Sequence, residues 1–434
     1  MIAVGTKSTW LVVALAGIFL AHAARAETIA VIHAKAYTIA ADKPIDDATI
    51  VFADGKIISV NAGAATPAGA KVIDAAGRIV TPGFMSGATQ LGLVEVNAAA
   101  ETNDQSVSSG PLGAAFDVQY ALNANSALLT VARADGVTRA MAYPSGAATA
   151  PFSGMGALIR LSEGPDLAER VKAAMFVAVG AATIDSGGGS RSAQWVLLRN
   201  ALDEARQFTN ASRTTGPRDQ LLNRPDVLAL AGMFSSRMPL VIAAQRESDI
   251  RQAIKLQDDY GLKVVIFGGT EAWRAVDELA RAKIGVILNP MANLPWTFDE
   301  IGGRLDNAAL LAKAGVAVAF VVPGNTIHLS HNVGLALREG AGLAVANGLS
   351  YTEALKALTV NPARIWGIAD HYGTLSPGQD ADLVIWDGDP LEPSSAPTAV
   401  FIAGRAVSLV TRQIELRDRY APARRNDPWP PAYR

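Results

Sequence analysis

The middle of the chain alternates short apolar runs with longer amphipathic stretches, and this alternation limits the folds open to it. Near-continuous apolar runs are typical of strands buried on both faces, and the stretches between them have helical periodicity. Repeated units of this kind predict a parallel sheet covered by helices, either a (β/α)8 barrel or a doubly wound open sheet. The apolar runs are 136–144, 173–180, 239–244, 263–269, 284–290 and 316–324, and the helical stretches are 193–208, 248–260, 271–282, 307–314, 333–347 and 351–359.

Both ends of this region are flanked by a different pattern, typical of short strands joined by tight turns. Asp54-Gly55 separates two β-branched runs, and Asp-Gly in that position favours a hairpin. Apolar, β-branched runs return after residue 380. The predicted strands are 28–32, 48–52, 56–60, 72–74, 78–80, 382–386 and 399–405.

Composition excludes several classes of protein. The chain has 434 residues, enough for one large domain and a smaller one, and a net charge of −2. That charge gives no reason to expect nucleic acid or an anionic membrane surface as a partner. The chain has no cysteine, which excludes disulfides and thiolate metal sites.

The N-terminus has the pattern of a secretory signal peptide. Lys7 precedes an apolar stretch at 10–20, which is too short to span a bilayer. Ala24-Arg25-Ala26 then matches a cleavage site, so we expect residues 1–26 to be removed after Ala26. Together with the absence of cysteine, this predicts a periplasmic protein without a membrane anchor.

Two motifs frame the chain. Residues 80–90 read Val-Thr-Pro-Gly-Phe-Met-Ser-Gly-Ala-Thr-Gln, and residues 373–384 read Gly-Thr-Leu-Ser-Pro-Gly-Gln-Asp-Ala-Asp-Leu-Val after Asn-Pro-Ala-Arg at 361–364. Over roughly residues 29–410 the chain resembles the amidohydrolase superfamily, nearest its imidazolonepropionase-like branch. The resemblance implies a (β/α)8 TIM-type barrel at 84–366 and a β-sandwich built from both chain ends, 27–83 and 367–415. We expect residues 416–434, which are basic and rich in proline, to form an extended tail.

The resemblance also shows what the chain lacks. In the family the first barrel strand ends in Asp-x-His-x-His, whose histidines bind a divalent metal, and further ligands follow later strands. Ala88 and Gln90 stand at the first two positions, and an amide oxygen is a poor zinc ligand beside imidazole. The later histidine positions fall at about Ala243 and Gly268, and the catalytic aspartate falls at about Pro323. We therefore expect no metal and no other cofactor at the family site.

Histidines elsewhere leave one alternative. Of the five, His22 precedes the cleavage site, and His33 and His371 are expected in the sandwich. His328 and His331 follow the last barrel strand, and an i, i+3 pair can face one way on a helical turn. A divalent metal relocated there would need a third ligand, for which the candidates are Glu95, Glu101 and Glu271. The alternative is a polar loop over the barrel mouth.

Other polar residues are expected near strand ends, where a barrel places its site. They could line a pocket with His328 and His331, or they could be ordinary loop residues and helix caps. These pocket candidates are Gln90, Glu95, Arg246, Glu271 and Asn289.

These features predict a periplasmic amidohydrolase-like protein that has lost its metal site. Such a protein would bind a small molecule, or act as an accessory pseudoenzyme in a homo-oligomer or beside an active paralogue. The alternative is a hydrolase of C–N bonds in non-peptide or cyclic amides, with a relocated metal or a metal-free mechanism. The sequence does not identify the ligand.

Overall fold

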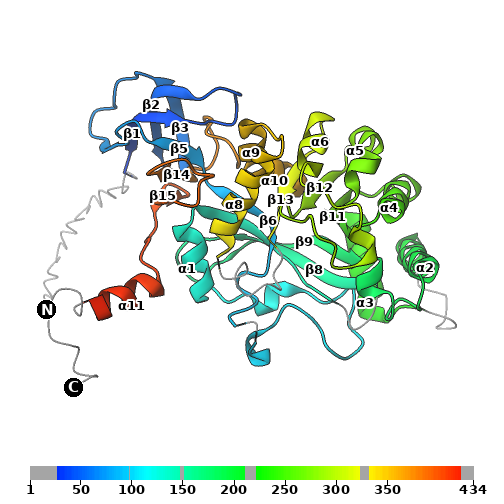
Figure 1. The fold of residues 1–434 in the computed structure, drawn as a ribbon. Helices are drawn as coiled ribbons and strands as arrows, with labels where there is room; N and C mark the ends of the chain where they lie inside the picture. The colour runs from blue at the N-terminus through cyan, green and yellow to red at the C-terminus, as the bar shows by residue number, and fades with distance from the viewer. Residues whose placement is uncertain (1–26, 97, 147–150, 211–220, 323–331, 422–434) are drawn as a thin grey trace, which may run out of the picture.

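The computed structural model describes residues 27–96, 98–146, 151–210, 221–322 and 332–421 as two sheets flanked by helices (Figure 1). The expected signal peptide lies outside the described residues, as do Pro323, His328 and His331. Within the described part, no helix combines the length and the apolar character needed to cross a membrane.

One sheet is built from both ends of the chain. Its strand order is β16-β15-β14-β5-β1-β2-β3, with β4 paired to β1, so β14 from the C-terminal part lies antiparallel to β5 from the N-terminal part. The Asp54-Gly55 turn joins β2 to β3, and both residues have positive φ (53° and 76°), as a two-residue hairpin requires. The strands are β1 Ile29–Ala36, β2 Ile45–Ala53, β3 Lys56–Ala62, β4 Lys71–Asp74, β5 Ile79–Pro82, β14 Leu383–Trp386, β15 Pro397–Ile402 and β16 Arg405–Ala406.

The other sheet has eight strands in sequence order, from β6 to β13, and curls into a nearly closed barrel. At the seam, a Cβ on Gly87 of β6 would lie 2.8 Å from the carbonyl oxygen of Phe320 of β13, so glycine allows the two strands to approach. This closure favours the barrel over the doubly wound sheet. The strands are β6 Phe84–Thr89, β7 Val137–Ala142, β8 Phe152–Arg160, β9 Ala168–Ala178, β10 Leu240–Ala244, β11 Val264–Gly268, β12 Gly285–Leu288 and β13 Val318–Phe320.

The barrel is not entirely parallel, which corrects the expectation of eight βα units. β8 runs antiparallel to both β7 and β9, and residues 161–167 join β8 to β9 without a helix. No strand was predicted at 152–160, a segment that contains Gly154 and Gly156. Gly156 makes room for a ring: a Cβ there would lie 2.7 Å from Cε2 of Phe176.

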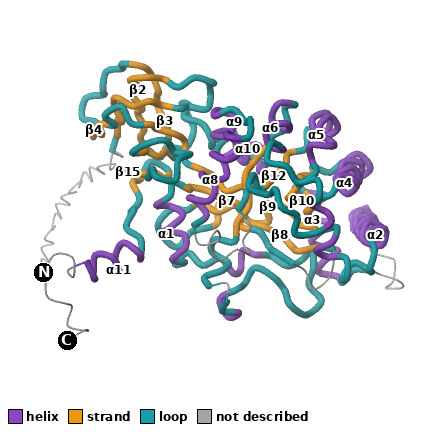
Figure 2. The backbone as a smooth tube through the Cα atoms, in the orientation of Figure 1, coloured by secondary structure: helices purple, strands orange, loops and turns teal. Residues whose placement is uncertain are grey.

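Helices cover the outer face of the barrel (Figure 2). Most match the predicted helical stretches, and short 3-10 turns occur at Ala100–Thr102, Val118–Ala121, Ala181–Thr183, Ala272–Ala275 and Phe298–Glu300 (η1 to η5). The helices are α1 Ala127–Ala134, α2 Arg191–Asn210, α3 Arg224–Ser236, α4 Glu247–Tyr260, α5 Val276–Ala282, α6 Asn307–Lys313, α8 Val333–Ala346, α9 Tyr351–Leu358, α10 Val360–Trp366 and α11 Arg412–Tyr420.

Alternate residues of the barrel strands form two separate apolar cores. One set faces the helices, and the other fills the barrel interior, as the two-residue period of a strand requires. At one end of the interior, Trp366 of α10 packs inside and its indole N–H donates to the carbonyl oxygen of Gly87 at 3.0 Å. The interior set from the strands includes Met85, Ala88, Met141, Leu158, Phe176, Val241, Val265, Ile287 and Ala319.

The expected extended tail begins with a helix, which corrects the prediction for residues 416–420. Thr411 caps α11 by accepting a hydrogen bond from the N–H of Ile414, and Glu415 lies in its first turn. Arg417 and Arg419 lie in the last turn, where positive charge complements the helix dipole. The prolines that suggested an extended tail begin at Pro422 and lie outside the described residues.

Candidate functional site

The barrel mouth is formed by the carboxyl ends of the parallel strands, where the family places its metal. Ala88 of β6 is fully buried in the interior core. Ala243 of β10 is half-buried and pairs in register with Phe267 of β11. Phe267 therefore occupies the inward-facing position at the end of its strand.

Gly268, the position expected for the second histidine, directly follows Phe267 and is the last residue of β11. Its φ is +92°, and a Cβ there would lie 2.3 Å from Nε2 of Gln245. Oε1 of Gln245 accepts hydrogen bonds from the N–H and the hydroxyl of Thr270, at 3.2 and 2.7 Å. A side chain at Gly268 would have to displace the Gln245 amide and adopt a positive φ that residues other than glycine rarely take.

Three aromatic side chains gather where the interior approaches the mouth. The ring centroid of Tyr143, just after β7, lies 5.5 Å from that of Phe176 and 5.2 Å from that of Phe267. Burial raises the pKa of the Tyr143 phenol to about 12, so this group is neutral at physiological pH. These three rings make this part of the interior aromatic.

The residues at the family's ligand positions do not fit a divalent metal. Of the four that the structure describes, Ala88, Gln90, Ala243 and Gly268, only Gln90 has a side-chain oxygen. Zinc in a catalytic site takes three protein ligands from histidine, carboxylate or cysteine. We therefore derive no catalytic step through a metal at these positions.

Two pocket candidates, Gln90 and Glu95, lie on the loop after β6. The backbone carbonyl of Gln90 accepts hydrogen bonds from the N–H groups of Leu93 and Val94, at 3.0 and 3.2 Å. Oε1 of Glu95 accepts a hydrogen bond from Nδ2 of Asn123 at 3.0 Å. Glu101, offered as a possible third ligand, is exposed on η1.

Glu271 is a structural carboxylate. One oxygen accepts a hydrogen bond from the N–H of Glu247 at 2.9 Å, and the other accepts from the N–H of Gly302 at 3.1 Å. It thus joins the start of α4 to the loop before α6. Arg246 is exposed and precedes α4 without capping it through its side chain. Among the described residues, the one group of three possible metal-ligating side chains does not include Glu95, Glu101 or Glu271.

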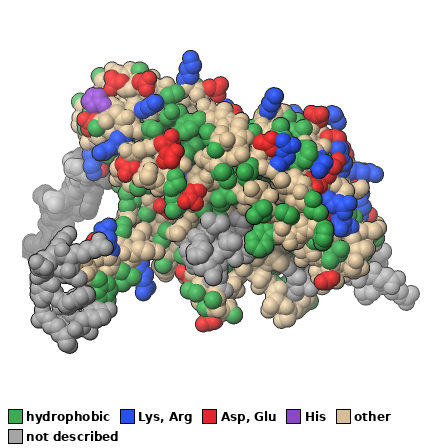
Figure 3. Space-filling view, viewed as in Figure 1, with side chains coloured by type: hydrophobic (Ala, Val, Ile, Leu, Met, Phe, Trp, Pro, Cys, Tyr) green, Lys and Arg blue, Asp and Glu red, His purple; other side chains and the backbone are tan. Residues whose placement is uncertain are grey.

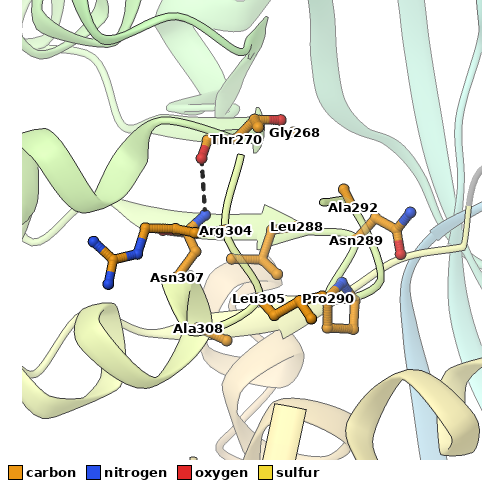
Figure 4. Close-up of a pocket in the computed structure, with 10 residues that line it drawn as sticks. All are labelled: Gly268, Thr270, Leu288, Asn289, Pro290, Ala292, Arg304, Leu305, Asn307 and Ala308. Carbon is orange, nitrogen blue, oxygen red and sulfur yellow. Dashed lines mark hydrogen bonds between the residues drawn. The ribbon is translucent and has the colours of Figure 1, made fainter. Parts of the chain in front are cut away.

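Asn289 lines a small cavity behind the mouth, between β11, β12 and α6 (Figure 4). Nδ2 of Asn307 donates to the carbonyl oxygens of Gly269 and Thr270, at 3.0 and 3.4 Å, whereas its buried Oδ1 has no protein partner. The enclosed space is about 10 Å³. That is room for about one water molecule, which would satisfy the unpaired oxygen.

A buried ion network that the sequence analysis missed follows β9. Nε of Arg191 lies 3.2 Å from Oδ2 of Asp249, and another guanidinium nitrogen contacts Asp299. Asp299 also accepts from the N–H of Ala181 at 2.7 Å. A Cβ on Gly180 would lie 2.7 Å from that carboxylate, so glycine makes the contact possible. The network joins the first turns of α2 and α4 to η3 and η5.

A second missed network lies at the opposite edge of the barrel. Arg139 is fully buried and contacts the carboxylates of Glu169 at 2.5 Å and of Asp382 at 3.2 Å, as well as that of Asp380. Burial opposes its charge, but these carboxylates outweigh that effect and raise the pKa of Arg139. A charged residue inside the apolar run 136–144 was the available signal, because a buried charge requires partners.

The same cluster contains three groups that could in principle hold a metal. Ligand atoms of Glu169, His371 and Asp380 all lie within 4.8 Å of one another. Arg139 already contacts both carboxylates, and Nζ of Lys56 lies 2.6 Å from Oδ1 of Asp380. Because these cations already compensate the carboxylates, the cluster functions as an ion-paired joint between the two sheets.

Comparisons with known proteins agree with the framing motifs. Residues 248–409 match the model of the amidohydrolase family. Amidohydrolase tasK of Hapsidospora irregularis is 23% identical over 376 residues, covering 78% of this chain and 37% of that protein. An imidazolonepropionase of Sphingopyxis alaskensis is 35% identical over 91 residues, covering 20% of this chain and 22% of the enzyme. The chain therefore spans little more than a third of the length of the former and about a fifth of the latter.

A solved structure shows the same fold over most of the chain. An amidohydrolase from Thermotoga maritima superposes with a TM-score of 0.77 at 24% sequence identity. The alignment covers 88% of this chain and 99% of that one.

Proposed function

We propose that this chain is a hydrolase-like member of the amidohydrolase superfamily that binds a small molecule without using the family's metal chemistry. The observation that carries the proposal is Phe267, whose ring takes the inward position at the end of β11. Ala88 is buried across the interior, so neither Ala88 nor Phe267 supplies an imidazole.

The chemistry of the walls indicates the kind of ligand. Tyr143, Phe176 and Phe267 offer aromatic surface, and the pKa of Tyr143 keeps its phenol neutral. Aromatic pairs add about 0.5–1.5 kcal/mol beyond the burial of area, in offset or tilted geometries such as these. We expect a small, uncharged aromatic or apolar ligand. We also propose that the protein is periplasmic, and mature protein beginning at Glu27 in a periplasmic extract would support this.

The binding proposal is tested with indole as the apolar probe. Isothermal titration should detect indole binding to the wild type, and Phe267→Ala should weaken it about tenfold through the lost ring contact. Tyr120→Ala removes an aromatic side chain that is 86% exposed on η2 and serves as the matched control. No binding to the wild type, or equal binding to the Phe267→Ala protein, would contradict the proposal.

The names of the relatives favour a second function, hydrolysis of a C–N bond in a non-peptide or cyclic amide. The chain is 28% identical to a dihydroorotase over 86% of that enzyme's length, and similar over a shorter range to imidazolonepropionases. This version requires a metal-free mechanism or a divalent metal relocated to His328 and His331. Turnover of hydantoin that is lost in a His328→Ala/His331→Ala double variant would support the relocated metal.

A further inference from the structure

The loop after β12 exposes an unusual amount of apolar surface. Leu294, Trp296, Phe298 and Ile301 are 77, 88, 90 and 63% exposed. Hydrophobic side chains also lie across the centre of the face in Figure 3. Monomeric proteins rarely expose large contiguous apolar patches, and those that occur often bind a partner. We refer to these four residues as the apolar loop.

An apolar groove lies beside this loop on the same chain. Its volume is about 540 Å³, within the range of pockets that accept ligands. It runs between η4, α5 and α6 and is lined by Trp273, Val276, Arg304, Leu310, Lys313 and Ala314. The indole N–H of Trp273 donates to the carbonyl oxygen of Gly302 at 2.9 Å, and Gly302 directly follows Ile301. The groove and the loop are therefore neighbours.

The groove has a rigid wall. Trp273 lies between two guanidinium groups, with the Cζ atoms of Arg274 and Arg304 at 4.3 and 4.7 Å from its ring. Arg304 is in turn paired with Asp306. These contacts fix the indole, so the groove is already formed before anything enters it, which lowers the ordering cost of binding.

We propose that the apolar loop of one copy of this chain binds in the groove of a second copy, while the apolar loop of the second copy binds in the groove of the first. The two copies then form a two-fold dimer. In a two-fold interface the same patch serves both partners, so a chain with a protruding apolar element beside an apolar groove satisfies both at once. Charge agrees with shape, because Glu300 lies within the loop and the exposed Lys313 lies at the groove.

The two aromatic side chains of the apolar loop supply a large part of the area that such a dimer needs. Two aromatic side chains at about nine-tenths exposure would bury roughly 300–450 Å² per copy. Leu294, Ile301 and the groove walls add to this, and a standard interface buries about 800 Å² per partner. Trp is also among the residues whose truncation costs most at interfaces. The inference concerns the outer rim and does not depend on the proposed ligand or on the metal question.

Sedimentation equilibrium of the processed full chain tests the proposal, and we expect the wild type to be a dimer. Trp296→Ser/Phe298→Ser should raise the dissociation constant by roughly thirtyfold or more. Ala314→Arg, which fills the groove from an exposed position, should have a similar effect from the other side of the contact. Tyr120→Ser, at an equally exposed aromatic on η2, should leave the constant unchanged.

All substituted side chains are exposed, so circular dichroism should show folded proteins in each case. A wild type that sediments as a monomer throughout the accessible concentration range would overturn the proposal. An unchanged dissociation constant in either the loop variant (Trp296→Ser/Phe298→Ser) or the groove variant (Ala314→Arg) would also overturn the proposal. The loop of one copy would then not be paired with the groove of the other.

Discussion

At the scale of single residues, glycines decide how the interior is filled. Gly156 of β8 faces the ring of Phe176 and the carbonyl oxygen of Ala142, and an added Cβ would lie 2.7 and 2.8 Å from them. Neither neighbour can retreat easily, since the carbonyl belongs to a barrel strand and the ring is packed against Tyr143. The absence of a side chain at Gly156 is therefore what allows an aromatic interior.

This predicts opposite effects for two glycine-to-alanine substitutions. Gly156→Ala should lower the free energy of unfolding by about 1–3 kcal/mol through overpacking. Gly232→Ala, in α3 with nothing within 4 Å of the new Cβ, should raise it by about 0.5–1 kcal/mol through helix propensity. Urea unfolding of both variants measures the difference. A Gly156→Ala protein as stable as the wild type would show that the ring has room to move.

At the scale of elements, Arg139 joins the barrel to the composite sheet. Arg139 lies on β7 and contacts Glu169 at the start of β9. It also contacts Asp380 and Asp382, which lie on either side of Ala381, just before β14. Removing one partner of a buried ion cluster leaves the others without compensation, which costs about 3–5 kcal/mol.

Arg139→Met should therefore lower the free energy of unfolding by about 3–5 kcal/mol in urea titrations. Arg417→Met, at a side chain that is 68% exposed on α11, should change it by less than about 0.5 kcal/mol. If both variants unfold at the wild-type urea concentration, the cluster does not stabilise the joint.

The elements also show what the sequence can predict. The hairpin at Asp54-Gly55 and most strands and helices follow from local turn chemistry and periodicity. β8 does not, because Gly154 and Gly156 are required by packing against residues that are distant in the sequence. The direction in which a strand residue faces is also hard to predict. A sequence pattern gives a strand's extent, whereas facing depends on register, such as the pairing of Ala243 with Phe267.

At the scale of the whole molecule, the fold agrees with that of an amidohydrolase, and the described residues at the expected ligand positions are Ala88, Gln90, Ala243 and Gly268. The fold with its composite sheet and nearly closed barrel superposes on the amidohydrolase from Thermotoga maritima with a TM-score of 0.77. The ends of β6, β10 and β11 present Ala88, Ala243 and Phe267 to the interior. The molecule as a whole is thus consistent with binding of a small molecule. The decisive question is whether it also holds a metal.

Metal content of the purified mature protein tests this most directly. Plasma mass spectrometry after growth with added zinc should find well under one zinc, manganese or iron per chain, because alanine and phenylalanine offer no ligand atoms. One metal per chain that survives dialysis, and is lost in the His328→Ala/His331→Ala variant, would contradict the account and favour a relocated hydrolytic centre.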